Sequence, residues 1–139
     1  MEHTVDAMLN HPLGSVIGYF AVAVLELIVF LWLFEMVTRY NCWEEIRKGN
    51  VAVSMATGGK IFGLCNVMRF SIQSGSSIYE TMKWSLVGFV LLLAAYLMFE
   101  FLTPFMSIDK EIAADNRAVG LTAMLISASL SYVIGAAIL

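Results

Sequence analysis

The chain carries little charge for its length, and few of the residue types that hold metals or cofactors. Only 14% of its 139 residues are charged, against about 25% in a typical soluble domain. Its two cysteines lie far apart without a C-x-x-C motif, and neither histidine lies in a long apolar run. Zinc knuckles, redox motifs and intramembrane haem ligation are therefore not indicated. A net charge of −3 also excludes a strongly basic nucleic-acid surface.

The side chains that catalysis requires are equally sparse. Intramembrane enzymes need clustered His, Cys, Asp or Ser groups, and no such cluster is visible in this sequence. No G-x-S-x-G nucleophile elbow is present either. We therefore expect no catalytic residues, no metal and no cofactor, and we expect the protein not to be an enzyme.

Long apolar runs are abundant instead, since 60% of the residues are hydrophobic. Four runs stand out, at about residues 15–38, 50–72, 82–103 and 117–139. Each has roughly the 20 residues that a bilayer core of about 30 Å requires. Alternation at period 2, typical of a transmembrane barrel, is absent. The sequence predicts an all-α membrane protein with four transmembrane helices, in a single integral membrane domain over residues 1–139.

A short phrase occurs twice in the chain. Its pattern is Glu-Ile, three free positions, Asn, one free position and Ala-Val, at residues 45–53 and again at 111–119. Each copy follows an apolar run and opens the next one. This predicts two tandem two-helix repeats, about residues 14–72 and 80–139. Because each repeat has an even number of spans, the repeats should be parallel, related by an axis along the membrane normal.

The second and fourth runs are rich in small residues, whereas the first and third are bulky. Small residues let helix backbones approach closely, which matters in lipid because lipid supplies no hydrophobic drive to association. We expect the second and fourth helices to form the inner packing or a subunit interface. The glycines that carry this expectation are Gly58, Gly59, Gly63, Gly120 and Gly135.

The distribution of Lys and Arg predicts the orientation. The two loops that hold the repeated phrase contain five of these residues, and the opposite side contains two, Arg69 and Lys83. The positive-inside rule then puts the loops in the cytoplasm and both termini outside it. Loops 39–50 and 104–117 would face a cytoplasmic protein partner.

The repeated phrase supplies polar candidates, Glu45 and Asn50 in one copy and Glu111 and Asn116 in the other. Asn is among the best helix N-caps, so these asparagines could simply start the second and fourth helices. Alternatively, the paired polar helix starts line a common vestibule, since helix N-termini attract anions. Trp43 is expected to anchor at the membrane interface.

Two ionisable residues lie in the middle of apolar runs, Glu26 in the first and Lys60 in the second. By the helical rise of about 1.5 Å per residue, Glu26 lies about 20 Å from Arg39 and Lys60 about 15 Å from Asn50. Ions at such depth cost several kcal/mol unless paired or hydrated. We expect a Glu26–Lys60 pair, within one subunit or between two. It would be a structural ion pair or a water-accessible site for a proton, ion or small solute.

Several segments together resemble the bacterial membrane proteins grouped as Domain of Unknown Function 350. The segments are residues 43–53 (WEEIRKGNVAV), 58–63 (GGKIFG), 99–104 (FEFLTP) and 115–120 (DNRAVG). The resemblance covers nearly the whole chain from about residue 14. It implies a small multi-pass protein of the bacterial inner membrane with two copies of a two-helix unit. It implies no activity and no catalytic residues.

Two functional hypotheses follow. The first is a non-enzymatic, homo-oligomeric membrane protein, such as an envelope-associated scaffold, whose partners are the lipid bilayer, its own copies and a cytoplasmic protein. The second is a small ion or solute channel or transporter that uses Glu26 and Lys60 with the polar helix starts at Asn50 and Asn116.

Overall fold

The computed structural model describes residues 4–139, and it is helical throughout its regular structure. The helices are α1 (Thr4–Leu9), α2 (Pro12–Val37), α3 (Cys42–Arg47), α4 (Val51–Ser74), α5 (Ile78–Leu102), α6 (Ile108–Ala113) and α7 (Arg117–Ile138). No strand occurs within this range. The expected domain of residues 1–139 thus begins with three residues that lie outside the described part.

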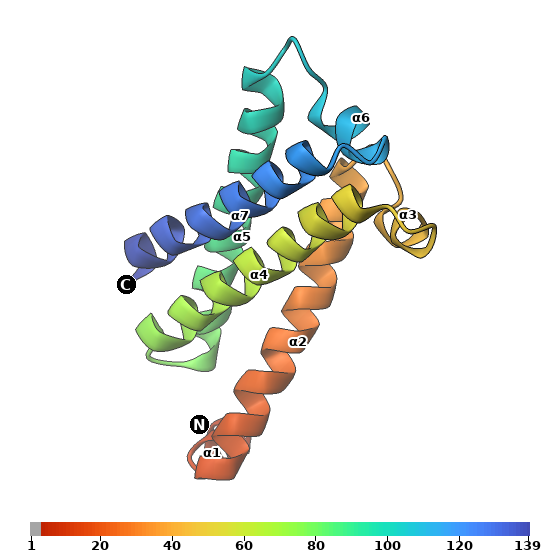
Figure 1. The fold of residues 1–139 in the computed structure, drawn as a ribbon. Helices are drawn as coiled ribbons and strands as arrows, with labels where there is room; N and C mark the ends of the chain where they lie inside the picture. The colour runs from red at the N-terminus through yellow and green to blue at the C-terminus, as the bar shows by residue number, and fades with distance from the viewer. Residues whose placement is uncertain (1–3) are drawn as a thin grey trace.

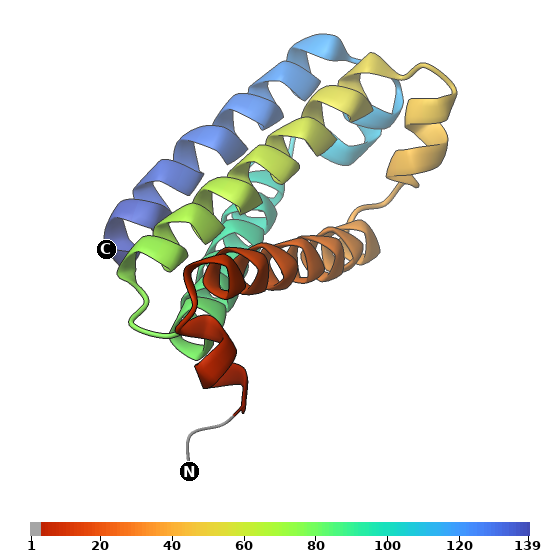
Figure 2. The ribbon, with the colours of Figure 1, turned by 90° about the horizontal axis from the view of Figure 1, so that it is seen from below.

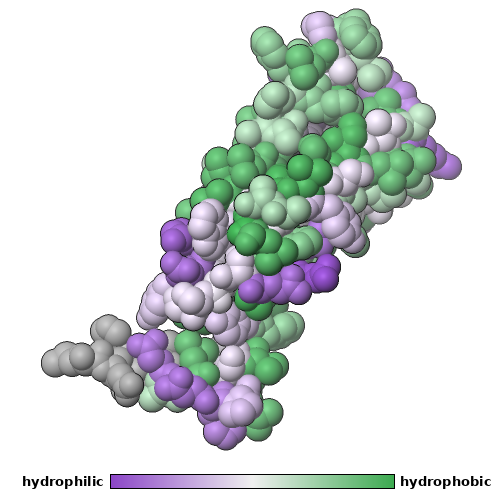
Figure 3. Space-filling view, turned by 90° about the vertical axis from the view of Figure 1, so that its left-hand side faces the viewer, coloured by the Kyte–Doolittle hydropathy of each residue, from purple (hydrophilic) through white to green (hydrophobic). Residues whose placement is uncertain are grey.

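Four of these helices, α2, α4, α5 and α7, are long and apolar enough to cross a membrane. They match the four expected runs within a few residues at each end, which confirms the all-α, four-span prediction. In the space-filling view an apolar band covers the middle of the visible face, and hydrophilic residues gather toward its ends (Figure 3). The short helices α1, α3 and α6 were not expected from the apolar pattern.

The four long helices form two layers. Helices α4 and α7 lie side by side and run in the same direction, while α2 and α5 lie behind them at an incline (Figures 1 and 2). Of the four, α4 is the most buried and α2 the least. One of the two helices rich in small residues is therefore the most enclosed helix of the bundle.

An aromatic core joins the two layers. The rings of Phe30 on α2 and Phe89 on α5 stack with centroids 4.4 Å apart. Phe34 meets Phe89 edge to face at 5.6 Å. Leu64 and Val67 on α4 complete this core, and each is only 1% exposed. Bulky residues of α2 and α5 thus pack against the smaller side chains of α4.

Glycines bring α4 and α7 into close contact. A side chain at Gly59 would meet the Cα of Met124 at 2.6 Å, and one at Gly120 would meet the Cα of Ala52 at 2.7 Å. Gly63 similarly faces the carbonyl oxygen of Ser127, and Gly135 faces the ring of Phe70. The backbones can approach because no Cβ intervenes.

Gly58 does not take part in this packing within the subunit, so of the two roles expected for it the subunit interface remains a prediction. Nothing lies within 4 Å of the position that its Cβ would occupy. The physical reason is the helical rotation of about 100° per residue, which turns Gly58 outward when Gly59 faces α7.

Candidate functional site at the loop end of the bundle

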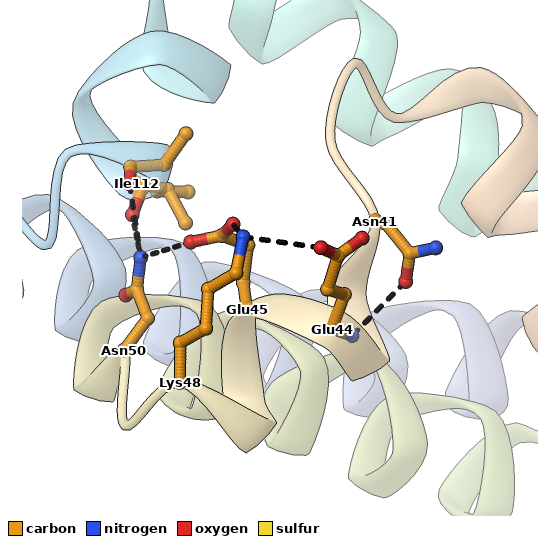
Figure 4. A network of polar contacts seen from close by, with 7 residues as sticks. Asn41, Glu44, Glu45, Lys48, Asn50 and Ile112 are labelled. Atoms are coloured by element: carbon orange, nitrogen blue, oxygen red, sulfur yellow. Dashed lines mark hydrogen bonds and ion pairs between the residues drawn. The ribbon is translucent and has the colours of Figure 1, made fainter.

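The first copy of the repeated phrase forms a compact polar turn between α3 and α4 (Figure 4). The Oδ1 of Asn50 accepts a hydrogen bond of 3.0 Å from the backbone N–H of Val53, so Asn50 caps α4. Its Nδ2 donates to Glu45 at 3.3 Å, and Lys48 donates to the other oxygen of Glu45 at 3.1 Å. These bonds, Lys48 first, lower the pKa of Glu45.

The second copy repeats the same local geometry between α6 and α7. Asn116 accepts a bond from the backbone N–H of Val119 at 3.4 Å, and its Nδ2 donates to Glu111 at 2.7 Å. Both phrases therefore start a long helix with an asparagine that also holds the glutamate five residues before it.

Each copy reverses direction through a left-handed residue just before the asparagine. Gly49 has φ of 89° and Asp115 has φ of 61°. Glycine adopts this conformation freely, and aspartate tolerates it better than most other residues. The matching positions thus have matching backbones, although their side chains differ.

The two copies also bind one another. The Nδ2 of Asn50 donates to the carbonyl oxygens of Ile112 at 3.3 Å and Ala113 at 3.0 Å, at the end of α6 (Figure 4). In return, Asp115 accepts a hydrogen bond of 2.9 Å from the backbone N–H of Ala52 in the first turn of α4. This bond lowers the pKa of Asp115. The phrases form a joint between the loops rather than two independent caps.

Lys60 lies beneath this joint and is only 4% exposed. Its ammonium donates a hydrogen bond of 3.2 Å to the hydroxyl of Thr38. It also lies 4.6 Å from the ring centroid of Tyr96 and 5.3 Å from that of Phe34. Cation–π contacts of this kind gain strength where the cation is desolvated. Lys60 is therefore enclosed by a hydroxyl and two aromatic rings.

Asp109 on α6 closes the same cluster from the loop side. It is 4% exposed, accepts a hydrogen bond from the hydroxyl of Tyr96, and accepts another of 3.1 Å from the backbone N–H of Arg39. Tyr96 thus lies between the ammonium of Lys60, which contacts its ring, and the carboxylate of Asp109, which binds its hydroxyl. The cluster ties α2, α4, α5 and α6 together.

The expected ion pair between Glu26 and Lys60 is not formed. Glu26 accepts a hydrogen bond of 2.7 Å from the hydroxyl of Ser85 on α5, and Lys60 binds Thr38. From Glu26 to Thr38 the distance along α2 is about 18 Å. Because Lys60 is almost fully buried within its own subunit, its ammonium is also shielded from the Glu26 of a second copy.

Helix inclination explains this correction. Counting residues from the loop assumes that both helices run along the membrane normal, but α4 is inclined to α2 (Figure 1). In addition, a helical side chain points toward the N-terminus of its own helix. Both effects carry the Lys60 ammonium toward the end of α2, away from Glu26.

The other features that could serve as a site are an exposed tryptophan, a buried cysteine and a very small cavity. Trp43 on α3 is 57% exposed at the loop end of the bundle, where an interface anchor would lie. Cys42 beside it is buried, and burial raises the pKa of its thiol, which makes it a weak nucleophile. The cavity lined by Lys60, Thr57 and Glu35 has a volume of about 10 Å³, near the minimum for one water molecule.

No three His, Cys, Asp or Glu side chains gather as metal ligands within residues 4–139. What the cluster does chemically is hold one buried cation and one buried carboxylate apart on either side of a tyrosine.

Sequence reasoning missed Thr38, Tyr96 and Asp109 as members of the Lys60 cluster, and it missed Ser85 as the partner of Glu26. Tyr96 was counted among the bulky residues of its span, and Asp109 precedes the repeated phrase. Their polar groups in or next to apolar runs were the available signal, because polar atoms there must find partners.

Comparison with known proteins agrees with this architecture. The sequence profile described as Domain of Unknown Function (DUF350) matches residues 8–138. The chain belongs to the DUF350 family.

Two relatives of this DUF350 protein are named as membrane proteins. The chain is 52% identical over 129 residues to the UPF0719 transmembrane protein YshE of Bacillus subtilis, covering 93% of this chain and 96% of that one. It is 25% identical over 119 residues to the UPF0719 inner membrane protein YjfL of Escherichia coli K12, covering 86% and 85%. No solved structure matches the chain significantly. Together with the four apolar helices, these names identify the DUF350 protein as an integral membrane protein.

Proposed function

We propose that this DUF350 protein is a non-enzymatic membrane protein that assembles with its own copies and presents its duplicated loops to a cytoplasmic partner, as a scaffold of the cell envelope would. One observation carries the proposal: the exposed faces of the two layers differ in kind. On α2 and α5 most of the exposed residues are large and apolar, such as Phe20, Ile28 and Val90. Large apolar side chains suit contact with lipid.

The exposed face of α4 and α7 is richer in small and hydroxyl-bearing residues, although Leu125 and Val133 on α7 are exposed as well. It holds Ser54 and Gly58 on α4, and Thr122, Ser129 and Ala136 on α7. Phe62 and Tyr132 lie on this face too, with ring centroids 6.4 Å apart. Small and hydroxyl-bearing residues are enriched where helices pack in membranes, because they allow close backbone approach and interhelical hydrogen bonds. A second copy of the chain is the occupant that this face favours.

Measuring the subunit number tests the assembly. Purified protein in mild detergent and in nanodiscs should contain more than one copy, by light scattering or native mass spectrometry. Gly58→Leu and Ser129→Leu should shift the protein toward the monomer. Both substitutions place a larger side chain in the proposed interface and so keep the helix backbones apart. Ala94→Leu is the matched control, because Ala94 is an exposed small residue on α5. A wild-type monomer in both media would refute the assembly.

We further infer that α2–α4 and α5–α7 are two tandem repeats in parallel orientation, with the loops in the cytoplasm and both termini outside. The matching caps at Asn50 and Asn116 and the shared direction of α4 and α7 support the repeat. Single cysteines at Lys48, Lys110 and Ser76, with Cys42 and Cys65 replaced, test the orientation. An impermeant thiol reagent added to intact cells should label position 76 only.

The loop end offers an exposed surface for the cytoplasmic partner. Trp43 is 57% exposed and Phe105 is 86% exposed, and both lie outside the spanning helices. A photo-crosslinking amino acid at position 43 or 105 should give a discrete protein adduct in cells, and one at Tyr79 at the opposite end should not. Adducts with lipid alone at positions 43 and 105 would argue for membrane anchoring instead.

Transport is the second candidate, favoured by the two ionisable side chains that lie in the middle of spanning helices, Glu26 and Lys60. Glu26 is half-buried and bound only by a hydroxyl, and the Lys60 ammonium has no carboxylate within ion-pair distance in residues 4–139. Such groups often mark ion or proton pathways. Liposome flux assays should then show a leak that Glu26→Gln or Lys60→Met changes. Equal flux with the wild type and both variants would exclude these residues from a pathway.

A further inference from the structure

A lateral groove runs between α2 and α4 at the end of the bundle opposite the duplicated loops. Its volume is about 460 Å³, and its lining includes Phe20, Ala23 and Leu27 from α2 with Cys65 and Met68 from α4. This volume falls within the range of about 300–1,000 Å³ usual for small-ligand sites. Ala23 and Cys65 are the small side chains that leave the hollow between the helices.

The groove is lined almost wholly by apolar atoms, and two residues with polar ends lie at one end of it. Arg69 and Gln73 are both exposed and line the groove, and residues four apart share a face of a helix. The guanidinium of Arg69 lies over the ring of Phe70, with its central carbon 5.4 Å from the ring centroid. Arg69 lies five residues before Ser74, the last residue of α4, or about 8 Å along the helix axis. No carboxylate lies within ion-pair distance of Arg69 among residues 4–139. The charge of Arg69 therefore lies near the membrane boundary, next to the apolar groove that extends toward the middle of the membrane.

We propose that this groove binds one anionic phospholipid, with an acyl chain between α2 and α4 and the headgroup phosphate against Arg69 and Gln73. The guanidinium of arginine presents a fork of donors that matches phosphate geometry. The amide of Gln73 adds a further donor. With the loops on the cytoplasmic side, the lipid comes from the outer leaflet.

The dimensions favour a lipid chain over a helix of another protein. A transmembrane helix is about 10 Å across, so a volume of about 460 Å³ would hold about one turn of it. A flexible acyl chain fills a narrow trough along its length instead. The charge pattern agrees, since the lining is apolar and the charged end of Arg69 lies beside the end of the groove where a headgroup would lie.

Native mass spectrometry of the purified full-length protein tests the proposal, with phosphatidylglycerol, phosphatidylcholine and inorganic phosphate as probes. Phosphatidylglycerol should bind with a stoichiometry of one per subunit and about fivefold more tightly than phosphatidylcholine, the factor that one arginine near a membrane surface supplies. Inorganic phosphate should not be retained, since it lacks the chain. Arg69→Gln should abolish the preference, and Arg69→Lys should keep most of it.

Two further variants separate the contribution of the acyl-chain groove from that of the charge of Arg69. Ala23→Phe fills the groove and should lower the affinity for both phospholipids, with the helical content checked by circular dichroism. Lys83→Gln is the matched charge control, because Lys83 is an exposed cation at the same end of the bundle that does not line the groove, and the preference should persist. Equal binding of both phospholipids, or a preference unaffected by Arg69→Gln, would overturn the proposal. The number of bound phospholipids is counted per subunit. The result therefore does not depend on whether the protein assembles with its own copies.

Discussion

The side chain of Asn66 on α4 donates a hydrogen bond of 3.0 Å to the hydroxyl oxygen of Ser131 on α7, with both residues buried. Ser131 in turn donates to the carbonyl oxygen of Ala128 at 2.6 Å. This hydrogen bond lies in the contact between α4 and α7, among the glycines that let the two backbones approach. It joins the two helices that follow the repeated phrase.

A double-mutant cycle measures that link. Asn66→Ala and Ser131→Ala should each destabilise the protein, and their coupling energy should be about 0.6 kcal/mol and no more than about 1.7 kcal/mol, as found for interhelical hydrogen bonds in membranes. Unfolding in mixed micelles gives the four free energies. Strict additivity of the two substitutions would show that the bond contributes nothing.

The two adjacent glycines of α4 should respond in opposite ways to a methyl group. Gly59→Ala places a Cβ 2.6 Å from the Cα of Met124, so the backbones must separate, at a cost of about 1–3 kcal/mol typical of overpacking. Gly58→Ala meets nothing within 4 Å and should be neutral or mildly stabilising. Thermal unfolding of the two variants in one detergent checks the contrast. A similar loss of stability in both variants would contradict the finding that Gly59 faces α7 and Gly58 does not.

Lys60 should tolerate loss of charge better than reversal of charge. Lys60→Met keeps the volume beside Phe34 and Tyr96 and should change stability by less than about 1.5 kcal/mol. Lys60→Glu puts an unpaired carboxylate in a buried site that Asp109 already makes negative, and should cost about 3–5 kcal/mol.

The charge swap provides the control for Lys60. Adding Glu26→Lys to Lys60→Glu should not restore stability, because the two side chains bind separate hydroxyls, Ser85 and Thr38. Folded yield and thermal midpoint are the measurements. Rescue by the swap would mean that the residues do form a pair.

Asn50 should contribute more to stability than Asn116. Replacing an asparagine N-cap with alanine costs about 0.5–2 kcal/mol, and both residues cap a helix. Asn50 additionally donates to the carbonyl oxygens of Ile112 and Ala113, bonds with no counterpart at Asn116 among the described residues. Asn50→Ala should therefore destabilise more than Asn116→Ala in the same unfolding assay.

Asn50→Asp separates the two roles of the side chain. The carboxylate retains the cap on Val53 but cannot donate, and it adds a charge next to Glu45. Asn50→Asp should therefore be less stable than the wild type. Asn116→Asp also adds a charge, next to Glu111, but it loses only the one bond donated to that residue and should destabilise less. Equal effects at both positions would argue that the joint between the loops adds nothing to stability.

Asp115 should make the stability of the protein fall as the solution becomes acidic. Its pKa is lowered from 3.8, first by the bond from the backbone N–H of Ala52 and then by Arg117. A carboxylate with a lowered pKa in the folded state stabilises above its unfolded pKa, and this stabilisation is lost as the pH falls through the folded pKa. Asp115→Asn should be less stable than the wild type at neutral pH.

The pH series supplies its own control for Asp115. The gap between wild type and Asp115→Asn should narrow as the pH drops below 3.8. Asparagine tolerates the left-handed backbone at this position, so strain does not confuse the comparison. A gap that stays constant with pH would mean that the carboxylate charge is not what binds Ala52.

Local signals in the sequence predicted much of the architecture. Runs of about 20 apolar residues predicted the spans, and the asparagines predicted the starts of α4 and α7. These features depend on a few neighbouring residues, so distant parts of the chain do not alter them. The pairing of Glu26 with Lys60 within one subunit was wrong because it depended on the relative inclination of two helices, which no local pattern encodes.

By itself, the sequence determined that this protein is four apolar helices joined by capped polar turns, because length, hydropathy and capping are properties of contiguous residues. Only the tertiary structure decided that Lys60 lies against Tyr96 and Thr38, that Asp109 binds Tyr96, and that Asp115 holds the first turn of α4. Those partners are 13–63 residues apart in the chain, and the tilt and close packing of the helices select which of their polar groups meet.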